Sequence, residues 1–145
     1  FLDEATALAA GHRPCAECQR ERFNHFRERW AVANPHLIDT PTPPVAVIDG
    51  VLHQERLKKE QRPILSLRES DRLPSGCFVA PLNDGHAYLV VEGQLLRWTP
   101  FGYEQLAKPI TTAVAILLTP PSTLRTLATG YVAGLHPSAA PVVNR

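Results

Sequence analysis

The chain has 145 residues, of which 44% are hydrophobic and 20% are charged, and its formal net charge at pH 7 is +1. A chain of this length and near-average composition is typical of one globular domain with a single core, and it is unlike a disordered protein. The charge excludes a strongly basic nucleic-acid binder of the histone type, and the longest apolar run, AVAILL, is far shorter than the roughly 20 residues of a membrane-spanning helix.

The cysteine content indicates the compartment. The sequence has three cysteines and no secretory signal, which favours reduced thiols in a cytoplasmic protein over a disulfide framework. It contains no Met and opens inside what should be an ordered element. We therefore expect that residue 1 is not the natural start and that important residues precede it.

The first predicted element is a short helix over residues 4–10. Asp3 is a suitable N-cap, strong helix formers follow it, and Gly11 can end the helix in the left-handed conformation. Pro14 then turns the chain, because it restricts its own φ and disfavours helical geometry at Arg13. The pair Cys15 and Cys18 therefore lies just after a helix end.

A second, amphipathic helix is predicted from residue 17 to about 34. Phe23, Phe26 and Trp30 recur at helical spacing and would lie on one face. The other positions carry arginine together with glutamate. We interpret this helix as docked on a core through its aromatic face. The alternative is an arginine surface for phosphate contacts, made by Arg13, Arg20, Arg22, Arg27 and Arg29.

The middle of the chain predicts one further helix and then a charged connection. Pro44 suits a first helical turn and the apolar residues keep helical spacing, so we expect a helix over 44–58, although Gly50 costs about 1 kcal/mol relative to Ala. The stretch ERLKKEQRPILSLRESDR, residues 55–72, is typical of a helix end followed by a solvated loop.

After residue 76 the hydrophobic period changes towards two. CFVAP, HAYLVV and QLLRW are separated by glycine-containing turns and predict a three-stranded meander over 77–98, with a fourth strand at AVAILL, 113–118. PPSTLRTLATGY predicts a last helix, capped by Ser122 or Thr123 and ending at Gly130. The tail from His136 shows no periodicity. The fold class is thus α+β, with a small, mostly antiparallel sheet of about four strands and a short C-terminal helix.

The Cys-x-x-Cys spacing lets two thiolates face one ion while backbone amides support the sulfurs, as in a zinc knuckle. The segment FLDEATALAAGHRPCAEC resembles the second half of the metal-binding domain of bacterial Ada-type alkylation-response proteins. The resemblance covers about 18 of the 145 residues. It implies a bacterial protein in which Cys15 and Cys18 bind zinc, and it allows a connection with DNA. It does not imply methyl transfer, because the methyl-accepting cysteine of that family belongs to the first cysteine pair.

The resemblance implies that this first cysteine pair would lie before residue 1. From the residues alone, ligands within the chain remain the alternative. Cys77 is more typical of a buried apolar residue, and His12 occupies an aromatic position of the resembled motif, where packing is expected. His25 lies two helical turns beyond Cys18, about 10 Å away, which is too far to share its ion. His136 is a candidate from the far end of the chain.

These features predict two regions, residues 1–36 with the knuckle and the amphipathic helix and residues 37–145 with the α+β part, packed as one domain. The first functional hypothesis is a zinc-stabilised cytoplasmic module that binds nucleic acid. The second is a small enzyme that uses Cys77, His86 or His136, although no local nucleophile signature supports it. The third is a protein-interaction domain without catalysis. An aromatic cluster of Trp98, Phe101 and Tyr103 would either stack on bases or seal one end of the sheet.

Overall fold

We describe residues 1–108, 110 and 112–140 of a computed structural model, which has α+β architecture. The helices and strands follow in the order α1 (Glu4–Ala9), α2 (Arg20–Ala33), α3 (Val45–Leu57), η1 (Lys59–Gln61), β1 (Ile64–Ser66), η2 (Leu67–Arg72), β2 (Phe78–Pro81), β3 (Tyr88–Val91), β4 (Gln94–Thr99), β5 (Gly102–Gln105), β6 (Val114–Leu117), α4 (Pro121–Ala128) and η3 (Pro137–Ala139), where η marks a 3-10 helix.

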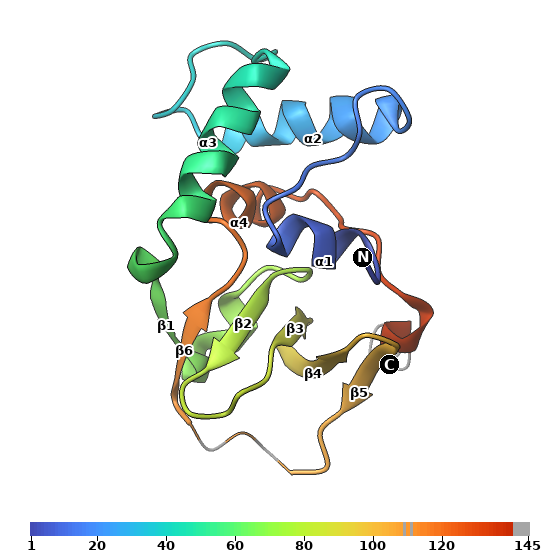
Figure 1. The fold of residues 1–145 in the computed structure, drawn as a ribbon, viewed down its shortest axis with the longest axis vertical. Helices are drawn as coiled ribbons and strands as arrows, with labels where there is room; N and C mark the ends of the chain where they lie inside the picture. Colours follow the sequence, from blue (N-terminus) through green and yellow to red (C-terminus); the bar gives the residue numbers. More distant parts are fainter. Residues whose placement is uncertain (109, 111, 141–145) are drawn as a thin grey trace.

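The helices are stacked on one side of the sheet. Figure 1 shows α1 and α4 next to the strands, with α2 and α3 lying beyond them. Helix α4 packs against both α2 and α3, and α1 contacts β2. None of the helices in the described part of the chain combines the length and apolar character that crossing a bilayer requires.

The sheet has the strand order β1-β6-β2-β3-β4-β5, and all its pairs are antiparallel. The meander β2-β3-β4 and the strand β6 confirm the predicted strands. The β3–β4 turn contains Glu92 and Gly93, both at positive φ, as a two-residue hairpin connection requires. The expectation of about four strands was wrong, because the described chain forms six.

The two strands that the sequence did not reveal both lie at an edge of the sheet. Strand β1 has only β6 as a neighbour and lies inside the charged stretch 55–72, where Ile64 is 68% exposed. Strand β5 pairs only with β4, and its Glu104 accepts a hydrogen bond from Arg97 at 2.7 Å. An edge strand needs little apolar alternation, because one side of it faces solvent. Its residues therefore resemble loop residues.

Local signals placed the ends of the first helix well. Asp3 accepts a hydrogen bond from the Thr6 amide at 2.8 Å, and Gly11 follows α1 at a φ of +90°, which confirms both predicted signals. Helix α2 starts three residues later than predicted, because the segment from Cys15 to Gln19 forms a turn closed by a Gln19 N–H to Cys15 carbonyl bond of 3.0 Å.

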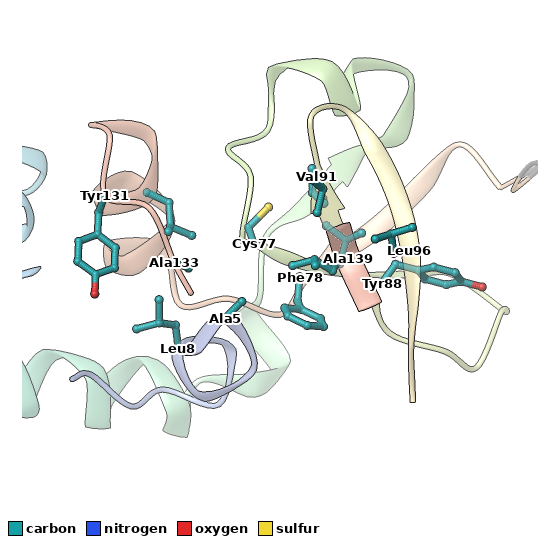
Figure 2. Close-up of a cluster of buried hydrophobic side chains, with 14 of the residues drawn as sticks. Ala5, Leu8, Cys77, Phe78, Tyr88, Val91, Leu96, Tyr131, Ala133 and Ala139 are labelled. Carbon is teal, nitrogen blue, oxygen red and sulfur yellow. The ribbon is translucent and has the colours of Figure 1, made fainter. Parts of the chain in front are cut away.

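The aromatic face of α2 is buried as predicted. Phe23 is 3% exposed, and Phe26 and Trp30 are fully buried. Phe26 and Trp30 belong to the helical side of a core that continues onto the sheet through side chains such as Leu89 and Val90. Figure 2 shows part of this buried cluster, with side chains from α1, from β2 to β4 and from the segment after α4.

The cap of α4 differs from the prediction. Ser122 and Thr123 lie inside the helix and are buried, and Pro120 occupies the N-cap position. The role of the cap is taken by Glu55 of α3, whose carboxylate accepts hydrogen bonds from the Ser122 amide, at 2.9 Å, and from the Ser122 hydroxyl. A carboxylate at a helix N-terminus also interacts favourably with the helix dipole.

The tail was predicted to be irregular, but Pro137–Ala139 form a 3-10 turn against β5, and residues 141–145 lie outside the described residues.

The three tyrosines give a prediction about alkaline pH. Tyr88, Tyr103 and Tyr131 are 2%, 7% and 2% exposed, and burial raises the pKa of each phenol, that of Tyr88 to about 12. Tyr88 also donates a hydrogen bond of 2.6 Å to Asp84, which further raises its pKa because the bond favours the neutral phenol. Unfolded tyrosine ionises near pH 10. Folding therefore favours the neutral phenols, and this contribution is complete below about pH 10 and is lost as pH rises through 12.

We expect tyrosinate absorbance to stay low above pH 10 and then to appear together with the loss of helical circular dichroism. Titration of both signals in the same samples tests this. A midpoint near pH 10 with the circular dichroism unchanged would contradict the burial of these rings.

Candidate metal centre

The Cys-x-x-Cys segment forms a compact turn between α1 and α2. The amide of Cys18 donates a hydrogen bond to the Cys15 sulfur at 3.3 Å, and the Gln19 N–H bond to the Cys15 carbonyl closes the turn. Cys15 is half-buried, Cys18 is exposed, and both are free thiols. This arrangement brings two sulfur atoms to one side of a turn that is anchored at the start of α2.

The two thiols differ in their tendency to ionise. Backbone amides of Cys18 and Glu17 lower the pKa of Cys15, because their dipoles stabilise a thiolate, and the Cys18 thiol adds to this effect. The pKa of Cys18 is raised, because its thiol donates to the Cys15 sulfur and then faces the charge on it. The two sulfurs thus interact directly, and a divalent cation could take the place of the thiol proton between them.

Cys15 borders a cleft of about 400 Å³, which it shares with His12, Arg13 and Asp49. Arg13 forms a two-pronged ion pair with Asp49 of α3, with Nε–Oδ1 and Nη2–Oδ2 distances of 2.9 and 3.1 Å. Such paired hydrogen bonds are specific as well as strong. Arg13, the residue before Pro14, therefore connects the Cys15–Cys18 turn to α3. No sequence pattern indicates Asp49 as the partner, because 36 residues separate it from Arg13.

Among the described residues, the structure brings no third ligand to the cysteine pair. Within residues 1–108, 110 and 112–140, no group of three or more His, Cys, Asp or Glu side chains is arranged to hold a metal ion. His12 is exposed with its ring 4.9 Å from that of Phe1, and His25 stacks on Tyr131 at 5.3 Å. His136 uses Nδ1 to accept from the Ser138 amide at 3.1 Å. The donor set present, two free thiols, fits half of a four-ligand zinc site.

Most of the arginines predicted to contact phosphate are engaged within the protein. Arg13 pairs with Asp49, and Arg22 pairs with Glu4 while its guanidinium lies 4.9 Å from the Tyr131 ring centre. Arg27 lies over the ring of Phe23, and Arg29 donates to the Thr129 carbonyl at 3.4 Å.

Arg20, at the first position of α2, is exposed, and its side chain makes no hydrogen bond or ion pair within the described residues. It is the member of the predicted set with the greatest access to solvent.

The groups considered for catalysis do not come together around an activated thiol. Cys77 is fully buried, and burial raises the pKa of its thiol to about 12, so it is protonated at neutral pH. Figure 2 shows its side chain between Ala133 and the strands. His86 is exposed in the β2–β3 connection, whereas the Nδ1 atom of His136 caps the turn η3. A thiol nucleophile needs a lowered pKa or an adjacent base, and Cys77 has the opposite environment.

This contrast predicts the order of thiol reactivity. Treatment of the metal-free, folded protein with iodoacetamide at neutral pH should modify Cys15 and Cys18 and leave Cys77 intact, because alkylation needs both access and a thiolate. Peptide mass spectrometry over a time course measures this. Cys77 should react only when denaturant is added, and its modification at the rate of Cys18 in the folded protein would contradict its burial.

The aromatic cluster near the β4–β5 turn is divided between core and solvent. Tyr103 is 7% exposed and donates through its hydroxyl to Asp3 at 2.8 Å, and Trp98 is half-buried. Phe101, at the tip of the turn, is 90% exposed. The three rings therefore do not form one exposed platform for bases, and two of them cover the end of the sheet.

Comparison of the chain with models of known protein families, with curated proteins and with solved structures finds no match.

Proposed function

We propose that this protein is a zinc-stabilised module in which Cys15 and Cys18 supply two thiolate ligands to a structural zinc ion. The observation that carries the proposal is the turn itself, in which the Cys18 amide supports the Cys15 sulfur and backbone dipoles favour a thiolate there. Zinc favours thiolate ligands in tetrahedral structural sites, and its binding releases the thiol protons.

The remaining ligands come from outside the described arrangement, either from further polypeptide or from a second copy of the chain. Two thiolates alone leave half of a tetrahedral site open. A second copy would contribute the same pair about a two-fold axis and complete a four-cysteine site. In that case zinc binding is coupled to dimer formation.

The first experiment measures zinc per chain in the purified protein by elemental analysis, together with its mass in solution. The matched variants are Cys15→Ser with Cys18→Ser, which removes both ligands, and Cys77→Ser, which tests a buried thiol that is not proposed as a ligand. We expect zinc to be lost in the double variant and retained in folded Cys77→Ser. About one zinc per chain in a monomer indicates ligands within one polypeptide, and one per two chains in a dimer indicates a shared site.

Zinc that is retained when both Cys15 and Cys18 are replaced would overturn the proposal. So would the absence of zinc uptake by folded, reduced wild-type protein in the presence of excess zinc. Cobalt(II) offers a second readout, because a tetrahedral thiolate site gives visible and charge-transfer absorption that the double variant should lack.

The second part of the proposal is that this module binds nucleic acid. Arg20 carries it, because its guanidinium is exposed on the surface just after Cys18. Arg27, half-buried over Phe23, is the nearest further candidate on α2. With two phosphate contacts, the affinity should fall roughly tenfold between 50 and 200 mM salt.

Fluorescence anisotropy with a labelled DNA duplex tests this partner. The variant Arg20→Gln with Arg27→Gln should weaken binding at low salt and reduce its salt dependence. The matched control Arg68→Gln with Arg72→Gln removes the same charge from η2, and Arg68 is exposed there. Equal weakening in both variants would indicate a general charge effect and would contradict an interface on α2.

A further inference from the structure

A larger cavity lies away from the cysteine pair, and neither part of the proposed function uses it. It measures about 670 Å³ and lies between the end of α3, the turn η1 and the segment that enters α4. We call it the α3–α4 pocket. Its volume falls within the range of about 300–1,000 Å³ that is typical of small-molecule sites.

The interior of the α3–α4 pocket is apolar. Leu117, at the end of β6, is 1% exposed, and Pro120 is buried at the start of α4. Pro63 and Leu57 continue the apolar lining towards solvent, and Leu57 is 66% exposed at the surface. A ligand would therefore meet mostly hydrocarbon inside and would cover an exposed leucine.

The outer part of the pocket is cationic. Arg56, Lys58, Lys59 and Arg62 line it, and Glu55 is the one carboxylate among its lining residues. Both oxygens of Glu55 are already occupied by the amide and hydroxyl of Ser122 at the start of α4. The pocket thus has an excess of positive charge that its own carboxylate does not neutralise.

Three of these cations have no partner that would compete with a ligand. Within the described ranges 1–108, 110 and 112–140, Lys58, Lys59 and Arg62 form no ion pair and no side-chain hydrogen bond. These three residues lie in or directly beside the turn η1. A hydrogen bond of 2.9 Å from the Gln61 N–H to the Lys58 carbonyl closes this turn. Arg56 is oriented by donating to the Gly11 carbonyl at 2.9 Å.

We propose that the α3–α4 pocket binds a small organic anion that has an apolar body and one terminal oxyanion group, such as a phosphate, carboxylate or sulfonate. The apolar body fills the interior next to Leu117 and Pro120, and the oxyanion accepts hydrogen bonds from Lys59 and Arg62. Hydrogen bonds between ionised partners are stronger than neutral ones, and they gain further strength at the edge of an apolar cavity. A polynucleotide would use the cations alone and leave the apolar interior unfilled.

Two fluorescent probes that differ by one group test the proposal. 8-Anilinonaphthalene-1-sulfonate carries the sulfonate, and N-phenyl-1-naphthylamine has the same ring system without it. We expect one sulfonate probe per chain, bound at least tenfold more tightly than the neutral probe. The variant Lys59→Gln with Arg62→Gln should weaken sulfonate binding at least tenfold and change binding of the neutral probe less than twofold. The control Arg68→Gln with Arg72→Gln removes the same charge elsewhere and should change neither affinity.

The outcomes separate this pocket from the alternatives. Equal affinity for both probes, or equal effects of the two charge variants, would overturn the proposal, because the anionic group would then not be recognised in the pocket. Displacement of the sulfonate probe by an oligonucleotide but not by a small aryl phosphate would overturn it in favour of a polyanion surface. Thermal unfolding of each variant establishes that it is folded. The Cys15→Ser, Cys18→Ser protein, if folded, should bind the sulfonate probe with unchanged affinity. The pocket proposal is therefore tested independently of the zinc proposal.

Discussion

Replacing Phe26 with Ala is expected to lower the free energy of unfolding by about 4 kcal/mol, because truncation of a buried aromatic ring removes its burial and leaves a cavity. Phe26 is fully buried on α2, and its ring forms an edge-to-face pair with that of Tyr131, at a centroid distance of 5.3 Å and an interplanar angle of 89°. Such edge-to-face pairs add to the energy of burial. Chemical denaturation followed by circular dichroism measures the change.

Two matched variants make this prediction specific. Phe26→Leu keeps most of the buried volume and should cost less than half as much as Phe26→Ala. Val32→Ala, on the exposed side of the same helix, should change stability by less than about 0.5 kcal/mol, because Val32 is 56% exposed. A loss below 1 kcal/mol for Phe26→Ala would mean that α2 does not pack on the segment after α4 through this ring.

The second large effect is expected from Asn34, a fully buried polar side chain at the end of α2. Its Nδ2 donates to the carbonyls of Trp30 and Ser122 at 2.8 and 3.2 Å, and its Oδ1 accepts from Arg125 Nε at 2.7 Å. Asn34→Leu keeps a similar volume but removes all three bonds. We expect a loss of about 2 kcal/mol, because the half-buried guanidinium of Arg125 loses its acceptor and the carbonyls of Trp30 and Ser122 each lose one of their donors.

A double-mutant cycle separates the bonds of Asn34 from its packing. Arg125→Leu in the Asn34→Leu background should cost less than Arg125→Leu alone, because the guanidinium has already lost its acceptor. Asn24→Leu, at an exposed position of α2, provides the control and should be nearly neutral. Additive effects of the two substitutions would show that the Asn34–Arg125 bond does not contribute to stability.

These two positions bear on the candidate metal centre because both hold α2, which begins two residues after Cys18. Phe26 fixes the helix against Tyr131, and Asn34 joins its end to α4. Neither residue touches the cysteine turn. The stability of the fold and the binding of zinc can therefore be measured separately, at a temperature at which each variant remains folded.

The sequence by itself determined the features that depend on near neighbours. The helix start at Asp3, the buried face of α2, the meander from β2 to β4 and its turns all follow from contacts or dihedral preferences within a few residues. The bonds of the Cys15–Cys18 turn are also local, spanning three and four residues, but the hydrophobic pattern placed the start of α2 inside this turn. Such preferences act wherever the segment lies in the fold, so a pattern in the sequence is enough to indicate them.

Only the tertiary structure decided the features whose partners are far apart in the chain. Strand β1 exists because β6 returns beside it, with Ile64 opposite Ile116. The cap of α4 comes from a residue 67 positions earlier, and the acceptor for Arg125 from one 91 positions earlier. In the sequence, the cations of the α3–α4 pocket are typical of a solvated stretch. Only the fold brings the apolar end of β6 next to them. The free energy of each of these contacts depends on which surfaces meet, and that is set by the packing of the whole chain rather than by any local preference.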